Sequence, residues 1–120
     1  MKPELGIATR RLEQQWPGHA RRLVYPGRKG WPDFMLSYGG RVAFVELKAV
    51  PTVGATIPIT AGQRDELTEL GREGLCAVLL TLVDGKFWAA HRPPFKAKKL
   101  KASGDCVHFT VLTPKFIFGS

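Results

Sequence analysis

The chain has 120 residues, a formal net charge of +8 and a hydrophobic content of 44%. This length and composition are typical of one folded domain, so they argue against extensive disorder. The excess positive charge favours a nucleic-acid partner over a neutral small molecule. No apolar stretch approaches the ~18 residues of a membrane span, and no signal-peptide pattern opens the chain. We therefore expect a single soluble domain over residues 1–120, located in the cytoplasm, with no membrane contact.

The first predicted element is an amphipathic helix over residues 3–16. Apolar residues recur at spacings of three and four from Leu5 to Trp16, and a Pro-Gly pair then ends the pattern. Glu4 falls in the first turn, where the helix dipole alone favours a carboxylate. On this pattern alone, Glu4 needs no functional role.

A short strand is predicted over residues 19–25, and a basic loop over residues 26–30 follows it. Arg28 and Lys29 are the cations of that loop, and its glycines allow the backbone to approach a phosphate closely. With Arg22 in the preceding strand, they are candidate DNA-binding residues. The alternative is an ordinary solvated, charged loop.

Residues 30–48, GWPDFMLSYGGRVAFVELK, predict a β-hairpin in which two apolar runs flank a Tyr-Gly-Gly break. Asp33 opens the first strand, and Glu46 and Lys48 close the second. Because strand side chains alternate between faces, Glu46 and Lys48 share one face and Leu47 points to the other. Pairing across the turn brings Asp33 beside them. The hairpin therefore predicts two carboxylates and an amine at one end of a sheet.

This grouping suits a divalent cation and a phosphodiester. Mg²⁺ takes oxygen ligands and retains water, so one or two carboxylates and the phosphate oxygens of a substrate suffice to hold it. Such a metal polarises a phosphate and activates water, and an ammonium at Lys48 stabilises the charge that develops on phosphorus. The alternative is a surface ion pair between Glu46 and Lys48, with Asp33 serving only in a turn after Pro32.

These motifs resemble those of the PD-(D/E)XK nuclease superfamily. More narrowly, they are similar to the small VRR-type nucleases of phages and prophages, which are described as Holliday-junction-resolvase-like. The resemblance extends from Glu4 to Trp88, and it rests on Gly30, Pro32-Asp33, Glu46-Leu47-Lys48 and Gln63. It implies an α/β fold with a restriction-endonuclease-like core, in which helices flank a central mixed β-sheet.

The resemblance also implies roles for individual residues. Asp33 and Glu46 would bind Mg²⁺ or Mn²⁺, the backbone carbonyl of Leu47 would add a ligand, and Lys48 would serve catalysis. Members of the superfamily often place a helix glutamate near the metal. By its spacing to the Pro-Asp motif, Glu4 matches that residue better than Glu13 does.

Residues 49–59 carry no charge and contain prolines and a glycine, which is typical of a mobile loop or extended arm beside the site, or of a plain connection. Thr60 then begins a second helix, because Thr60 and Gln63 have the spacing of a capping box. The cap is a complete structural reason for Gln63. The resemblance adds a second role, contact with the attacking water or a substrate phosphate.

Residues 75–83 are almost entirely apolar and predict a buried strand, and an Asp-Gly turn leads to its neighbour over residues 86–91. A lysine-rich run follows, and a last strand is predicted over residues 106–112. The apolar tail over residues 116–118 either packs on the core or supports a dimer. The lysines are candidate contacts to a DNA backbone, with a solvated face or RNA as alternatives; they include Lys96, Lys98 and Lys99.

Together, the motifs and the resemblance predict a metal-dependent endonuclease that hydrolyses DNA phosphodiester bonds. Nothing in the chain is typical of a base-reading helix, so we expect selection of branched DNA, such as a Holliday junction, rather than of a long sequence. Paired cuts require two sites, which a homodimer supplies by symmetry. The alternatives are a general or nicking phage DNA nuclease and a catalytically inactive basic DNA-binding module of the same fold.

Overall fold

A computed structural model describes the backbone of residues 3–24, 30–102 and 107–119, and the side chains of residues 5–24, 30–102 and 110–119. The described elements are three helices and six strands. In chain order they are α1 (Pro3–Gln15), β1 (His19–Arg22), β2 (Phe34–Tyr38), β3 (Arg41–Val50), α2 (Ala61–Arg72), β4 (Cys76–Val83), β5 (Phe87–His91), β6 (Val107–Phe109) and α3 (Pro114–Phe118).

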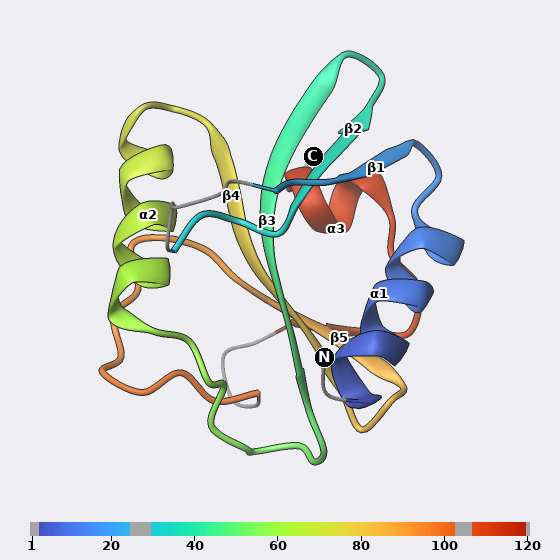
Figure 1. Ribbon diagram of the computed structural model, residues 1–120, viewed down its shortest axis with the longest axis vertical. Helices are drawn as coiled ribbons and strands as arrows, with labels where there is room; N and C mark the ends of the chain where they lie inside the picture. Colours follow the sequence, from blue (N-terminus) through green and yellow to red (C-terminus); the bar gives the residue numbers. More distant parts are fainter. Residues whose placement is uncertain (1–2, 25–29, 103–106, 120) are drawn as a thin grey trace.

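The six strands form one sheet in the order β1-β2-β3-β4-β5-β6. Neighbouring strands are antiparallel except β3 and β4, which run parallel because α2 connects them as a crossover (Figure 1). β4 is apolar along nearly its whole length because the sheet is covered on both faces there. The predicted mixed sheet with flanking helices is confirmed.

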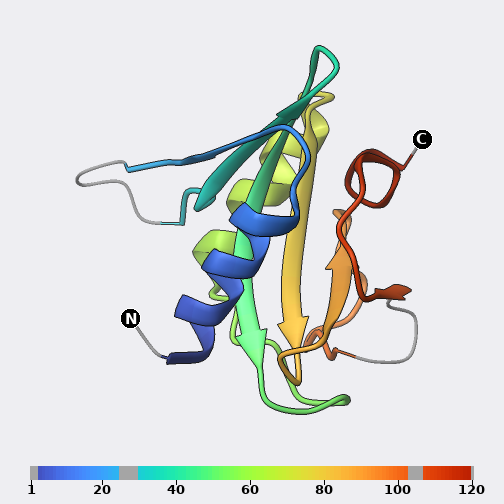
Figure 2. The same ribbon diagram turned by 90° about the vertical axis from the view of Figure 1, so that its right-hand side faces the viewer.

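The helices cover opposite faces of the sheet. α2 lies on one face, which we call the α2 face, and α1 and α3 lie on the other, which we call the α1 face (Figures 1 and 2). None of the helices that the structure describes is both long and apolar enough to span a membrane. The buried cluster of the α2 face consists of Val50, Ile57, Leu67, Ala77, Leu79, Val83, Ala89, Leu100 and Ala102.

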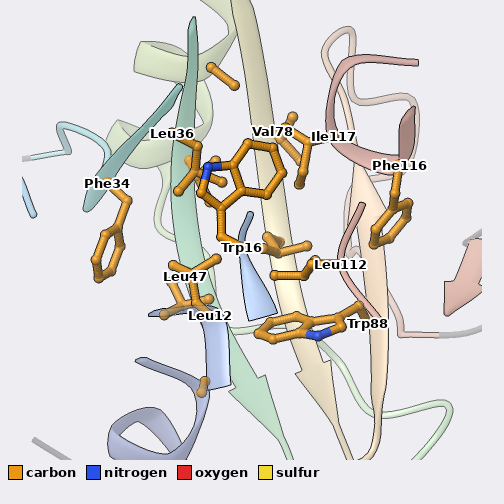
Figure 3. Packing of buried hydrophobic residues seen from close by; sticks show 14 of the residues in the cluster. Leu12, Trp16, Phe34, Leu36, Leu47, Val78, Trp88, Leu112, Phe116 and Ile117 are labelled. Atoms are coloured by element: carbon orange, nitrogen blue, oxygen red, sulfur yellow. The ribbon is translucent and has the colours of Figure 1, made fainter. Parts of the chain in front are cut away.

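The larger cluster lies on the α1 face. α1 contributes one apolar side to it. Trp16, the residue after α1, continues this side, and its indole N–H donates to the carbonyl of Ser37 at 3.1 Å. Figure 3 shows labelled members of this cluster that come from the N-terminal segment, the strands and the C-terminal segment. Its buried residues are Ala8, Leu12, Trp16, Phe34, Leu36, Ala43, Val45, Leu47, Val78, Leu80, Leu82, Trp88, Leu112, Phe116 and Ile117.

The first strand is shorter than predicted, because β1 stops at Arg22, opposite Phe34. One further bond follows, from the amide N–H of Leu23 to the carbonyl of Asp33 at 2.8 Å. Pro32, which precedes Asp33 in the segment that pairs with β1, has no N–H to donate. The pairing between these two segments therefore ends at Asp33, a residue of the candidate site.

The segment over residues 49–59 also differs from the prediction. Its first two residues belong to β3, which ends with Val50 opposite Val83. Beyond them the segment binds its own chain, since the Ile57 amide donates to the carbonyl of Leu100 at 2.8 Å. The plain-connection interpretation therefore describes it better than a free arm.

The C-terminal part was predicted partly correctly. The last strand, β6, ends at Phe109 and not at residue 112, because the chain bends at Thr110 and Val111, which are exposed; its predicted first residue, Cys106, lies outside the described residues. The apolar tail forms α3, and Phe116 and Ile117 are buried against the α1-face cluster. The predicted packing of the tail on the core is confirmed, while its role in a dimer stays a prediction.

Candidate active site

Consecutive residues of β3 point to opposite faces of the sheet. Val45 and Leu47 enter the core of the α1 face. Glu46 and Lys48 lie on the α2 face, and Glu46 is buried, with only 2% of its surface exposed. The alternation read from the sequence thus puts a carboxylate inside the protein, next to an amine.

Asp33 lies where the β2-β3 ladder ends. The last pair of that ladder is Phe34 with Val45, whereas β3 continues along β4 as far as Val50. The Asp33 carboxylate takes the place of the missing strand, because its Oδ2 accepts a hydrogen bond from the Leu47 amide at 3.0 Å. In an extended strand the N–H and C=O of one residue point to the same edge. The carbonyl of Leu47 therefore faces the edge that Asp33 occupies.

The two oxygens of Glu46 have different surroundings. Oε2 is 3.4 Å from the ammonium of Lys48 and accepts a hydrogen bond from Gln63 Nε2 at 3.2 Å. Oε1 is buried and has no hydrogen-bond partner among the described residues. The hydroxyl of Thr81, which lies opposite Lys48 in β4, is buried without such a partner as well. Unpartnered buried polar atoms are costly, so they point to a polar ligand at this position.

The surroundings of Glu46 favour its protonated form. Burial in the protein raises the pKa of Glu46 from 4.5 to about 8, and the nearby carboxylate of Asp33 adds to the rise. The ammonium of Lys48 acts in the opposite direction but does not cancel these effects. Two carboxylates in this arrangement therefore lack positive charge, which a cation would supply.

The first turn of α2 orients the amide of Gln63. Thr60 caps the helix, and its Oγ1 accepts a hydrogen bond from the Gln63 amide N–H at 3.1 Å. The Thr60 amide N–H in turn donates to Gln63 Oε1 at 2.9 Å. This box confirms the predicted cap and leaves only Nε2 of Gln63 to face Glu46. The cap and the contact with the site are therefore compatible.

Gly30 fixes the approach to Asp33. Its φ of +87° is a left-handed conformation, and a Cβ at this position would lie 2.8 Å from the carbonyl oxygen of Gly62 in α2. Glycine is therefore required both for its conformation and for its close approach to the helix. The segment that carries Asp33 thus packs on the same helical turn that carries Gln63.

The predicted DNA-binding cations are not all on one face. The Arg22 guanidinium lies 5.9 Å from the Phe34 ring, so it is on the α1 face, away from Glu46. Arg21, which was not among the predicted DNA-binding residues, lies opposite Met35 and hence on the α2 face. Strand alternation is the signal that separates the faces of these two arginines.

The other predicted site residues divide into two groups. Lys96, Lys98 and Lys99 are exposed in the segment that follows β5. Arg28, Lys29 and the side chain of Glu4 lie outside the described residues, although the backbone of Glu4 belongs to the first turn of α1. Within the described part of the chain, no group of three or more His, Cys, Asp or Glu side chains is arranged to hold a metal.

Comparisons with known proteins bear on the fold. No protein-family model and no curated protein matches this chain. The solved structure of Hjc from Archaeoglobus fulgidus, a Holliday junction resolvase from an archaeal hyperthermophile, is similar, with a TM-score of 0.59 and 18% sequence identity. The similarity covers 78% of this chain and 87% of Hjc. This chain therefore has the restriction-endonuclease-like α/β fold that its sequence predicted.

Proposed function

We propose that this protein is a metal-dependent endonuclease that hydrolyses DNA phosphodiester bonds and is selective for branched DNA. The observation that carries the proposal is the buried Glu46 carboxylate, which has Asp33, Lys48 and Gln63 around it and one oxygen without a partner among the described residues. The motifs of the VRR-type nucleases and the fold shared with Hjc, a Holliday junction resolvase, support the same conclusion.

The residues present fit Mg²⁺ or Mn²⁺. Two carboxylates and one carbonyl are too few to enclose an ion, but these cations retain waters and bind the phosphate oxygens of a substrate. Asp33, Glu46 and the Leu47 carbonyl would hold the ion, with Glu4 as a candidate for a further ligand. When bound, it supplies polarisation of the phosphate and a lowered pKa for a coordinated water.

Lys48 and Gln63 act beside these ligands. The side chain of Lys48 is 16% exposed, and its ammonium is held at the site by Glu46, so it can reach a phosphate oxygen of DNA and stabilise its negative charge. Gln63 Nε2 has two N–H groups, of which one donates to Glu46. The second is available to orient the attacking water or to bind the phosphate.

DNA binding rests on the net charge of +8 and on cations at several positions. The sequence contains nothing typical of a base-reading helix, which favours selection of a branch rather than of a sequence. Cutting a four-way junction symmetrically requires two sites, so we propose a homodimer. The candidate cations for this site are Arg28, Lys29, Lys96, Lys98 and Lys99, whereas Arg22 lies on the opposite face of the sheet from Glu46.

The test is a cleavage panel of a four-way junction, a flap and a linear duplex, each with Mg²⁺, Mn²⁺ or EDTA. We expect cutting of the junction with metal and none with EDTA. Equal cutting of linear duplex would contradict branch selectivity and favour a general or nicking nuclease. A wild-type protein that binds DNA but cuts none of the three would favour the inactive binding module.

Two substitutions test the residue roles. Asp33→Ala and Lys48→Ala should each slow cleavage by about a hundredfold or more, because the first removes a ligand of the metal ion and the second removes a positive charge beside the reacting phosphate. Both variants should still bind DNA. Asp65→Ala and Lys86→Ala, which remove exposed residues of the same two types, are the matched controls and should cut like the wild type. In a thermal shift assay, Mn²⁺ should stabilise the wild type but not Asp33→Ala.

A further inference from the structure

The lysine-rich segment after β5 is a loop fixed at both ends. We call residues 95–100 the lysine loop. Phe95 at one end is half-buried and packs on the α2-face cluster, and Leu100 at the other end is 5% exposed. The four residues between them, Lys96 to Lys99, are all exposed. The loop therefore presents three lysines between two apolar anchors.

The end at Leu100 is held by backbone hydrogen bonds to the segment that follows β3. The Ile57 amide donates to the Leu100 carbonyl at 2.8 Å, and the Ala102 amide donates to the Ala55 carbonyl at 3.0 Å. Thr56 and Lys101 form an isolated β-bridge between these two bonds. The C-terminal end of the loop is therefore continuous with a short, hydrogen-bonded ladder.

Arg64 of α2 holds the middle of the loop. Its Nη1 donates to the carbonyl of Lys98 at 2.6 Å, and its Nη2 donates to the carbonyl of Ala97 at 2.8 Å. Its guanidinium also lies 5.5 Å from the centre of the Phe95 ring. One side chain therefore joins the helix to three successive parts of the loop.

These bonds engage donors of Arg64 that could otherwise bind a phosphate. The planar set of donors on an arginine matches the oxygens of a phosphate group. Here two of those donors are directed to carbonyls of the loop. Arg64 also follows Gln63, whose amide contacts Glu46. The loop is therefore attached to the helical turn that reaches the candidate active site.

We propose that Arg64 is a positioning residue, which preorganises the lysine loop to bind the sugar-phosphate backbone of DNA. The proposal rests on the proposed function. A loop that is already ordered loses less conformational entropy when its lysines bind phosphates. Attachment to the first turn of α2 also holds the bound backbone in a fixed relation to Glu46.

The test compares three variants of the full chain. Arg64→Met removes the donors but keeps an apolar stem beside Phe95, and Arg64→Lys keeps the charge but not the paired donors. Arg72→Met is the matched control, because it removes the same charge from an exposed position of the same helix. Affinity for a four-way junction and a linear duplex is measured in EDTA over a range of salt concentrations, so that no cleavage is required.

We expect Arg64→Met to bind both DNAs about fivefold more weakly than the wild type. Arg64→Lys should retain less than half of the wild-type affinity, and Arg72→Met should stay within about twofold of it. The dependence of affinity on salt should be the same for Arg64→Met and the wild type, because no phosphate contact is lost. The double variant Lys98→Ala, Lys99→Ala should instead show a weaker salt dependence.

Limited digestion with trypsin gives a second readout. It should cut after Lys96, Lys98 or Lys99 faster in Arg64→Met than in the wild type or in Arg72→Met. Equal loss of affinity in Arg64→Met and Arg72→Met would overturn the proposal, as would an unchanged rate of digestion. A salt dependence that falls by about one phosphate contact in Arg64→Met would show that Arg64 binds DNA itself, which also overturns it.

These outcomes separate the inference from the proposed function. Loss of affinity and faster digestion in Arg64→Met, in a protein that cuts no DNA, would support the positioning role while the nuclease proposal failed. If the wild type cuts DNA and Arg64→Met binds DNA as tightly as the wild type does, the nuclease proposal is supported and the positioning role of Arg64 fails. A wild-type protein that binds no DNA in EDTA at low salt would overturn the positioning role.

Discussion

Leu47 and Glu46 are neighbours in β3 and are almost equally buried, with 1% and 2% of their surface exposed, yet they contribute in opposite ways. Leu47 packs among apolar side chains on the α1 face, and such burial stabilises a fold by about 1.5–3 kcal/mol. Glu46 is buried beside another carboxylate, which opposes folding whenever it is ionised. The α1 face of the strand thus stabilises the fold. The α2 face holds Glu46, a buried carboxylate that lowers the stability of the fold when it is ionised.

The largest expected effect on stability is that of Leu47→Ala. We expect a loss of about 2–5 kcal/mol in the free energy of unfolding, because the substitution leaves a cavity in the α1-face core. Urea denaturation of the wild type and the variant measures it. Leu75→Ala removes the same atoms from an exposed position and should cost far less. Equal losses in the two variants would mean that the α1 face does not hold the strand.

Glu46→Gln tests the other face through the dependence of stability on pH. The folded protein raises the pKa of Glu46 to about 8 from 4.5, so between these values the folded state binds more protons than the unfolded state. Stability of the metal-free wild type should therefore fall as pH rises through this window, by at most roughly 1.4 kcal/mol per pH unit from this group. Glu46→Gln has no proton to lose, so its stability should fall less.

The measurement is the free energy of unfolding in EDTA between about pH 5 and pH 8. Glu69→Gln, which removes an exposed carboxylate from α2, is the control and should keep the wild-type dependence on pH. If Glu46→Gln is less stable than the wild type at the alkaline end, then ionised Glu46 stabilises the fold and the contrast with Leu47 is wrong.

The parts of the site that depend on local interactions could be predicted from the sequence. Strand alternation was enough to put Glu46 and Lys48 on one face, and the spacing of Thr60 and Gln63 was enough to predict the cap. Both patterns act within a few residues of the chain. Both patterns can therefore be identified in a single sequence without knowledge of the tertiary structure.

What could not be predicted depends on contacts between distant parts of the chain. The bond from the Leu47 amide to Asp33 requires the exact end of the β2-β3 ladder, and the bonds from Arg64 to the lysine loop join residues far apart in sequence. Arg22 was selected for its charge, but register places it beside Phe34 on the other face. No local periodicity encodes these pairings.

The smallest expected effects separate the two roles of Gln63, which links the helix over the α2 face to Glu46. Thr60→Ala removes the cap and should cost about 1 kcal/mol of stability while the folded protein cuts DNA like the wild type. Gln63→Glu keeps an acceptor for the Thr60 amide but replaces the donor that faces Glu46 with a carboxylate. We expect lower stability in the absence of metal, because a third carboxylate joins the site, and cleavage about tenfold slower under conditions where the variant is fully folded, which corresponds to ~1.4 kcal/mol. Thermal melting and single-turnover cleavage measure the two effects. Slower cleavage in Thr60→Ala would show that Gln63 serves the helix alone. The same conclusion would follow if cleavage by Gln63→Glu were no slower than its loss of stability explains.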